Sequence, residues 1–452
     1  MNDTTQGALA PKASALRDAV SNLYRAVWRW HFYAGLLVLP FMITLAVTGA
    51  IYLFKDEVDN LVHADFMLVT PQDGRLAPSD IIAAALAAQP GVALQYTDPR
   101  SDIQSTEVSI MPDSGTRMTA YVNQYTGEVL EVRPHRSTFA WTVRYLHSFR
   151  FFGATPRMWI EIVAGFTILL VLTGLYLWWP RGQKGGVVTV RGDRTRRVFW
   201  RDIHAVTGVF TGAFLIFLVI TGMPWSSFWG AQVNQWANGS NFGYPSGVRI
   251  DVPMSGQKLD DVAKTSWSLE QAQLPESVPA ATSIGVDAAV AEFQALGLHR
   301  GFSVGLPRTD TGVFSGSVYP DDLRQQRVIH LDQYTAEPLV DMHYADYGPL
   351  GRWLEFGINT HMGQTFGLAN QIFLLLVCAG IVLTAVSAAI MWWKRRPAGG
   401  MGVPPLPSDR RVFIGLFAIL GIGGALFPLT GLALLVMVLL DLIWQAISRQ
   451  AA

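Results

Sequence analysis

Long apolar stretches alternate with polar regions along the chain. A helix needs roughly 20 mostly apolar residues to cross the hydrocarbon core of a bilayer. Four stretches meet this requirement, and each predicts a membrane-spanning helix. They lie at about 32–54, 158–179, 205–227 and 369–393.

A fifth apolar stretch, about 412–445, is longer than one span needs. Its middle contains Gly423, Gly424, Pro428 and Gly431, and residues of these types interrupt or bend a helix. The pattern is compatible with a tight hairpin of two helices and with one kinked, tilted helix, so both alternatives stay open.

Two long polar regions, about 55–157 and 228–368, separate the spans. Each contains a helical segment and runs of alternating apolar and polar residues, which are typical of antiparallel strands. We predict a small α+β unit in each region. The segment at about 228–268 has no counterpart in the first region. Its Gly, Asn and Trp residues favour a binding loop or lid over a strand scaffold.

The positions of Lys and Arg predict the orientation, because cytoplasmic loops carry an excess of both. Basic residues cluster before the first span, between the second and third spans, and after the fourth. These three segments are therefore predicted to be cytoplasmic. The two polar regions then lie outside, which in a bacterium is the periplasm.

Composition narrows the range of functions. Half of the 452 residues are hydrophobic, and 34 basic residues balance 34 acidic ones. Nucleic-acid binding needs a basic excess, so no nucleic-acid partner is expected. A lone cysteine, Cys378, cannot build a disulfide framework, a thiolate metal site or an iron–sulfur cluster.

The two halves of the chain match around four histidines. His31 and His204 are each followed by glycine at +4 and by Thr-Gly at +17 and +18. His147 and His361, each near the end of a predicted short amphipathic helix at the outer surface, are followed by Phe-Gly at +5 and +6 and by Trp-Trp at +31 and +32. The matching residues after the first two histidines are Gly35, Thr48 and Gly49 in one half and Gly208, Thr221 and Gly222 in the other.

The polar regions also share a motif, "NQYTGEVL" at Asn123 and "DQYTAEPL" at Asp332. We interpret these matches as an internal repeat. Both halves have the same predicted orientation, so the repeat is parallel and its pseudo-two-fold axis runs along the membrane normal.

Such an axis pairs His31 with His204 near the cytoplasmic face and His147 with His361 near the outer face. A single histidine at a membrane boundary is usually an interfacial residue, but four at matching positions favour a site. Neutral imidazole is a standard axial ligand of haem iron, so these four are the predicted cofactor ligands. Two histidines per level leave zinc or copper short of ligands.

The combination of "LHS", "FFG" and "LLVLTGLYLWWPR" with "YVNQYTGEVLEV" resembles the PepSY-associated transmembrane family over nearly the whole chain. The second half departs from this pattern, because "TAVSAAIMWWKRR" lacks Thr-Gly before its Trp pair. Similar members include inner-membrane dihaem reductases of ferric siderophores of the ferrioxamine type. The resemblance implies two b-type haems and an α-helical membrane protein with two PepSY-like outer domains.

The predicted organisation follows the spans and the repeat. It comprises 1–54, tail and first span; 55–137, outer domain 1; 138–180, interfacial helix and second span; 181–203, cytoplasmic loop; 204–227, third span; 228–345, outer domain 2 with the extra loop; 346–393, interfacial helix and fourth span; 394–411, cytoplasmic loop; and 412–452, the C-terminal hairpin or kinked helix.

The expected function is electron transfer across the inner membrane to a periplasmic ferric siderophore. The donor is expected to be a cytoplasmic reductase or quinol, and no catalytic side chain is expected beyond the haems. Trp229 and Trp236 are expected in a substrate loop, and His135 and His343 near the approach to the outer haem, although a solvated loop position is the alternative for each histidine.

Two other functions stay open. One is a non-enzymatic, membrane-anchored module whose outer domains bind a peptidase or a peptide. The other is a siderophore permease. Transport pathways usually contain ionisable residues inside the spans, and the expectation that this chain has none weakens the permease.

Overall fold

The computed structural model describes residues 10–153, 155–182, 185–238, 242–245, 254–259, 272–398, 400–404 and 421–450. The chain divides into two compact units. The helical unit comprises Met1–Ala50, Leu146–Trp229 and Leu375–Ala452, and the sheet unit comprises Ile51–Tyr145 and Gly230–Leu374.

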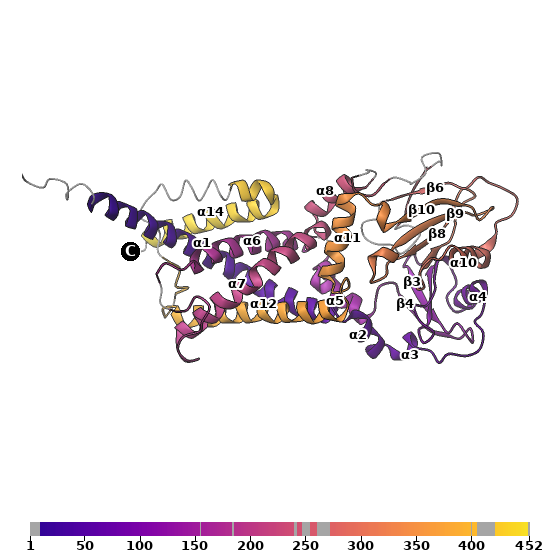
Figure 1. Cartoon of the computed structure of the whole chain (residues 1–452), viewed down its shortest axis with the longest axis horizontal. Helices are drawn as coiled ribbons and strands as arrows, with labels where there is room; N and C mark the ends of the chain where they lie inside the picture. Colours follow the sequence, from indigo (N-terminus) through magenta and orange to yellow (C-terminus); the bar gives the residue numbers. More distant parts are fainter. Residues whose placement is uncertain are drawn as a thin grey trace, which may run out of the picture. The chain divides into compact units, whose positions relative to one another are not determined.

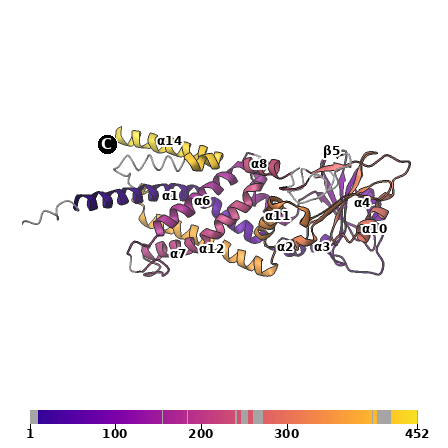
Figure 2. The same ribbon diagram turned by 45° about the horizontal axis from the view of Figure 1, so that its top comes forward.

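Within the described residues, four helices are long and apolar enough to cross a membrane. The long helices of the chain are α1 Ala10–Tyr52, α6 Met158–Trp178, α7 Arg197–Gly222 and α12 Leu368–Arg395, and they lie alongside one another (Figures 1 and 2). The four predicted spans are confirmed. Helices α1 and α7 begin earlier than predicted, because helical hydrogen bonding continues into polar residues beyond the apolar stretch.

The helices of the helical unit pack through apolar side chains and small residues. Val38 of α1 and Phe166 of α6 are fully buried in one cluster, and Val377 of α12 in another. A methyl group at Gly380 would lie 2.7 Å from Thr211 Cγ2, and one at Gly212 would lie 3.2 Å from Val171 Cγ1. These two glycines therefore allow α7 to approach α12 and α6 closely.

The fifth apolar stretch turns sharply. Residues 421–426 are helical, the helix breaks at Phe427, and α14 follows at Pro428–Gln450. Seven residues of straight helix span roughly 10 Å, yet a Cβ on Gly424 would lie 2.9 Å from Gly431 Cα. This reversal matches the hairpin alternative at this point. Residues 412–420 of the predicted stretch lie outside the described residues.

The expectation that the spans contain no ionisable residue is wrong, because Glu161 lies in the second predicted span and is 1% exposed. Asp202 of α7, just before the third predicted span, is 0% exposed. Each carboxylate is tolerated because it accepts several hydrogen bonds. Asp202 Oδ2 accepts from Arg191 Nε at 2.8 Å, and Glu161 Oε1 accepts from the backbone N–H of Trp229 at 2.8 Å.

The sheet unit is built on one eight-stranded antiparallel sheet with the order β10-β9-β8-β7-β1-β2-β3-β4. The two predicted α+β domains are therefore joined edge to edge through β1 and β7, with Tyr96 opposite Val304. The strands are β1 Val92–Thr97, β2 Thr106–Met111, β3 Met118–Val122, β4 Val129–Pro134, β7 Ser303–Gly305, β8 Val313–Val318, β9 Arg327–Asp332 and β10 Pro338–His343.

Two helices cover one face of this sheet. Helix α4 (Pro78–Ala88) packs on the first four strands and α10 (Gly285–Ala295) on the second four (Figure 2). Both share a single core, because Ile81 of α4 and Phe293 of α10 belong to the same buried cluster. The Ser79 hydroxyl donates to Asp287 Oδ2 at 2.6 Å and ties the two helices together.

Further helices pack on the opposite face. Helix α3 (Ala64–Met67) contacts β3 and β4 of the first half, and α2 (Lys55–Val62) contacts α3. Leu354 of α11 (Pro349–His361) is buried in a core cluster with Val328 and Val340 of the second half.

The segment at 228–268 is more regular than predicted. It forms helix α8 (Phe228–Ala237) and strand β5 (Met254–Lys258), and β5 pairs with β6 (Gln273–Pro275). The prediction of a loop is wrong at these positions, because Glu161 of α6 caps the first turn of α8 and β5 finds a partner strand beyond the predicted segment. The rest of the segment lies outside the described residues, apart from 238, 242–245 and 259.

Candidate functional site

His31 and His204 face each other inside the helical unit. His31 lies on α1 and His204 on α7, and their ring centroids are 6.2 Å apart with the ring planes at 81°. The sequence predicts this pair. The structure therefore brings together two residues that are 173 positions apart along the chain.

The imidazole of His31 is held through Nδ1. This nitrogen lies 2.9 Å from Thr173 Oγ1 on α6. The Thr173 hydroxyl donates to the carbonyl oxygen of Leu169 at 2.5 Å, so its oxygen accepts and Nδ1 of His31 donates. This arrangement leaves Nε2 of His31 with a free lone pair, as a metal ligand requires.

The imidazole of His204 is also held through Nδ1. Its Nδ1 lies 2.9 Å from the carbonyl oxygen of Thr384 on α12. A carbonyl oxygen only accepts, so Nδ1 carries the proton and Nε2 has the lone pair.

His147 is the last residue of helix α5 (Phe139–His147). A side chain of α1 contacts its Nδ1, as Thr173 contacts Nδ1 of His31. Its Nδ1 lies 3.0 Å from Thr48 Oγ1, and the Thr48 hydroxyl donates to the carbonyl oxygen of Thr44 at 2.6 Å. Nδ1 of His147 is therefore the donor. Its Nε2 carries the lone pair, as in the two other histidines.

Thr-Gly pairs cradle two of these histidines. Thr48 accepts from His147 while a methyl group at Gly49 would lie 3.2 Å from Cε1 of the same ring. Thr173 and Gly174 do the same for His31, again with 3.2 Å to Cε1. Sequence reasoning used these pairs only as marks of the repeat, and it missed their contact with the histidines.

Helix α2 holds the first turn of the helix that ends at His147. Asp59 Oδ1 accepts from the backbone N–H of Ala140 at 2.8 Å, and His63 Nε2 accepts from that of Phe139 at 3.0 Å. Capping of this kind stabilises a helix start. Asp59 and His63 therefore fix the helix that carries His147, a role that the sequence does not indicate.

His361 is also the last residue of its helix, α11. It belongs to the sheet unit, whereas His147 belongs to the helical unit. The pairing of His147 with His361 therefore stays a prediction.

The His31–His204 pair has the separation that one shared metal requires. Metal–imidazole nitrogen bonds are about 2 Å long, so two opposed imidazoles that share a metal have centroids roughly 6 Å apart. Among the described residues, no group of three or more His, Cys, Asp or Glu side chains can hold a metal ion.

Trp229 and Trp236, both predicted in the substrate loop, lie seven residues apart on α8. The Nε1 of Trp229 donates to the carbonyl oxygen of Leu426 at 3.0 Å. Trp236 is in the sheet unit with 54% of its surface exposed.

His135 and His343 lie at opposite edges of the sheet. His135 follows β4, with its Nδ1 2.9 Å from Thr119 Oγ1. His343 ends β10, beside Asp341 and Asp346. Six strands stand between β4 and β10, which corresponds to roughly 30 Å, so the two histidines do not share one site.

A family comparison covers most of the chain. The model of the PepSY-associated TM region matches residues 28–395, a range that includes all four predicted ligand histidines. No curated protein sequence matches the chain. Because the match covers far more than half of the sequence, the chain belongs to the PepSY-associated TM family.

Proposed function

We propose that this protein is a dihaem electron-transfer protein that carries electrons across a membrane and reduces a ferric siderophore on the outer side. The observation that carries the proposal is the opposed pair of His31 and His204. Two imidazoles from different spans meet at the separation of a shared metal, and each keeps Nε2 free for it.

A b-type haem, when bound, supplies the one-electron redox chemistry, and the protein sets its position and surroundings. Thr173 and the carbonyl group of Thr384 hold the imidazoles in one tautomer and one orientation. Hydrogen bonds to the ring nitrogen remote from the metal raise ligand basicity.

Two further glycines support a flat cofactor at this level. Gly35 and Gly208 each follow a ligand histidine by four residues and share its helical face. A methyl group would meet Leu170 at 3.7 Å and Thr384 at 3.8 Å, which are ordinary contact distances. Helix packing therefore does not require glycine at either position, whereas the edge of a macrocycle does.

The internal two-fold repeat is part of the proposal, and the sheet unit supports it. The strand order is symmetric about the β1–β7 junction. The shared motif also makes matching hydrogen bonds in the two halves. Gln124 and Tyr125 donate to carbonyl groups of the loop before β2, and Gln333 and Tyr334 donate to those of the loop before β8.

Extension of this symmetry to the outer level pairs His147 with His361 and gives a second haem. Basic residues flank the predicted cytoplasmic ends of the spans, so electrons enter there from a cytoplasmic reductase or from quinol. The ferric siderophore is then reduced at the outer haem, and ferrous iron leaves on the outer side.

The test is the haem content of purified full-length protein and of four single variants. The wild type should contain two non-covalent b-type haems by the pyridine haemochrome assay. His31→Ala and His204→Ala should lose the same haem, and His147→Ala and His361→Ala the other. His299→Ala, which changes an exposed histidine, is the matched control and should keep both.

A folded wild-type protein without haem would overturn the proposal and leave the non-enzymatic anchor as the better reading. Loss of one haem by His31→Ala and of the other by His204→Ala would contradict the pairing.

A further inference from the structure

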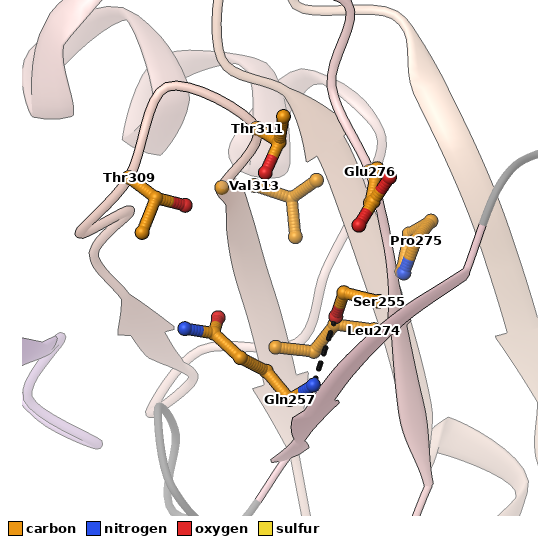
Figure 3. Close-up of a pocket in the computed structure, with 9 residues that line it drawn as sticks. Ser255, Gln257, Leu274, Pro275, Glu276, Thr309, Thr311 and Val313 are labelled. Atoms are coloured by element: carbon orange, nitrogen blue, oxygen red, sulfur yellow. Dashed lines mark hydrogen bonds between the residues drawn. The ribbon is translucent and has the colours of Figure 1, made fainter.

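The second half of the sheet unit contains a pocket. It has a volume of about 260 Å³ and opens to solvent. One wall is β5, a second is β6, and the third is the loop between β7 and β8 (Figure 3). The wall from β5, with Ser255 and Gln257, belongs to the segment that has no counterpart in the first half.

Two side chains of the turn after β9 hold the loop between β7 and β8 in place. Gln333 Nε2 donates to the carbonyl oxygens of Thr309 at 2.8 Å, Asp310 at 3.0 Å and Gly312 at 2.9 Å. The Tyr334 hydroxyl donates to the carbonyl oxygen of Asp310 at 2.9 Å. This wall of the pocket is therefore formed before any ligand binds.

The floor of the pocket is apolar. Leu274 and Val313 line it, and both are 2% exposed. They belong to the core cluster that joins this half of the sheet to α11. A ligand that enters the pocket therefore meets an ordered apolar surface at its base.

Polar side chains stand around this floor. The carboxylate of Glu276, the hydroxyls of Thr309 and Thr311 and the amide of Gln257 line the pocket (Figure 3). Over the described part of the chain, none of these four groups takes part in a hydrogen bond or an ion pair. No Lys, Arg or His is among the described lining residues, so the pocket has one negative charge and no positive charge.

We propose that this pocket binds a small organic cation, with a primary ammonium group and hydroxyl groups a few bonds away. The ammonium group has three N–H donors, and it donates to the carboxylate of Glu276. Thr309, Thr311 and Gln257 pair with the hydroxyls, and Leu274 and Val313 cover the carbon skeleton. The volume lies just below the range of roughly 300–1,000 Å³ typical of drug-sized ligands, so the ligand has the size of a monosaccharide.

This site goes beyond the proposed function and does not depend on it. The test uses the full-length protein in detergent and isothermal titration calorimetry. The probe is glucosamine, with glucose and N-acetylglucosamine as neutral ligands of similar shape. We expect glucosamine to bind at least tenfold more tightly than either neutral sugar. Glu276→Gln, which keeps the shape of the side chain, should remove this preference.

Glu337→Gln is the matched control, because Glu337 is an exposed carboxylate in the turn before β10. It should bind glucosamine as the wild type does. Equal binding of glucose and glucosamine, undiminished binding by Glu276→Gln, or no heat from glucosamine would each overturn the proposal. The haem content of all variants should be unchanged, so failure here and failure of the dihaem proposal are distinguishable.

Discussion

At the residue scale, threonine hydroxyl groups select the tautomer of His31 and His147. Thr48 and Thr173 each give their own proton to a backbone carbonyl one turn earlier and accept one from imidazole Nδ1. A hydroxyl that is already committed as a donor can only accept, so it selects one tautomer. The Thr-Gly recurrence is visible in the sequence, but its purpose is not, because the contacts cross 99 and 142 residues.

Thr173→Val should weaken haem binding at the inner level by about 10–100-fold, the usual cost of losing a group that orients a metal ligand. Valine keeps the shape but cannot accept from His31 Nδ1. Competition with apomyoglobin as haem acceptor measures the change. Thr173→Ser should restore binding. Thr44→Val, which removes a hydroxyl that donates to the carbonyl oxygen of Pro40, is the control. Wild-type retention by Thr173→Val would contradict the role of the hydroxyl.

His330 links the stability of the sheet unit to pH. Its side chain is buried in β9, with Nδ1 2.9 Å from Ser315 Oγ, and burial lowers the pKa of His330 to about 4. The ordinary pKa of histidine is about 6.5, so between these values the unfolded chain binds more protons than the folded one. Stability is therefore complete above about pH 6.5 and falls as the pH drops towards 4, by about 3 kcal/mol in total.

Thermal unfolding followed by circular dichroism between pH 7 and pH 4.5 measures this dependence. His330→Gln cannot titrate, so its unfolding temperature should fall less steeply with acid than that of the wild type. Parallel curves for the two proteins would show that His330 is not the group responsible.

At the element scale, the spans and most strands follow from the sequence, and the exceptions have physical causes. The strand at Val92–Thr97 was not predicted, because apolar and polar residues do not alternate in "VALQYT". Three consecutive residues in its middle are buried. The helix at Phe228–Ala237 was missed because Glu161, which caps it from α6, lies 67 residues away. A cap supplied from another helix leaves no local signal, whereas the cap of a surface helix usually does.

Glycines at the helix contacts should fall into two functional groups. Gly35→Ala and Gly208→Ala fit at ordinary contact distance and should leave the helices stable, yet they should reduce haem at the inner level. Gly380→Ala meets Thr211 at 2.7 Å and should destabilise the helices by about 1–3 kcal/mol, as overpacking does. Haem absorbance and the unfolding temperature of the same samples separate the two effects. Full haem content in both Gly35→Ala and Gly208→Ala would remove the glycines from the cofactor site.

At the scale of the whole molecule, the sequence predicted the class of protein better than its organisation. Four spans and two outer α+β regions were recognisable from hydrophobic periodicity and length. The union of both regions in one sheet was not, because the β1–β7 junction pairs residues about 200 positions apart and such pairing leaves no local pattern. The inner histidine pair followed from the repeat, since symmetry relates distant residues without any knowledge of packing.

Reduced protein should be reoxidised by a ferric siderophore, with one electron passing to each ferric ion and ferrous iron appearing. Anaerobic stopped-flow absorbance with a ferrous chelator measures both steps. Trp236→Ala, a change at an exposed aromatic side chain, should slow reoxidation while both haem spectra stay intact. Phe242→Ala is the comparison, because it removes another exposed aromatic side chain of the same segment. No reoxidation by any ferric chelate would exclude the reductase.

The junction of β1 with β7 has a consequence for the ancestry of the chain. A protein that consisted of the first half alone would end its sheet at β1, with a row of unpaired N–H and C=O groups along that edge. Two such copies would restore the eight strands by pairing β1 with β1, since an antiparallel pair of identical strands is itself two-fold symmetric. Under the proposed repeat, the present chain corresponds to the covalent form of such a homodimer.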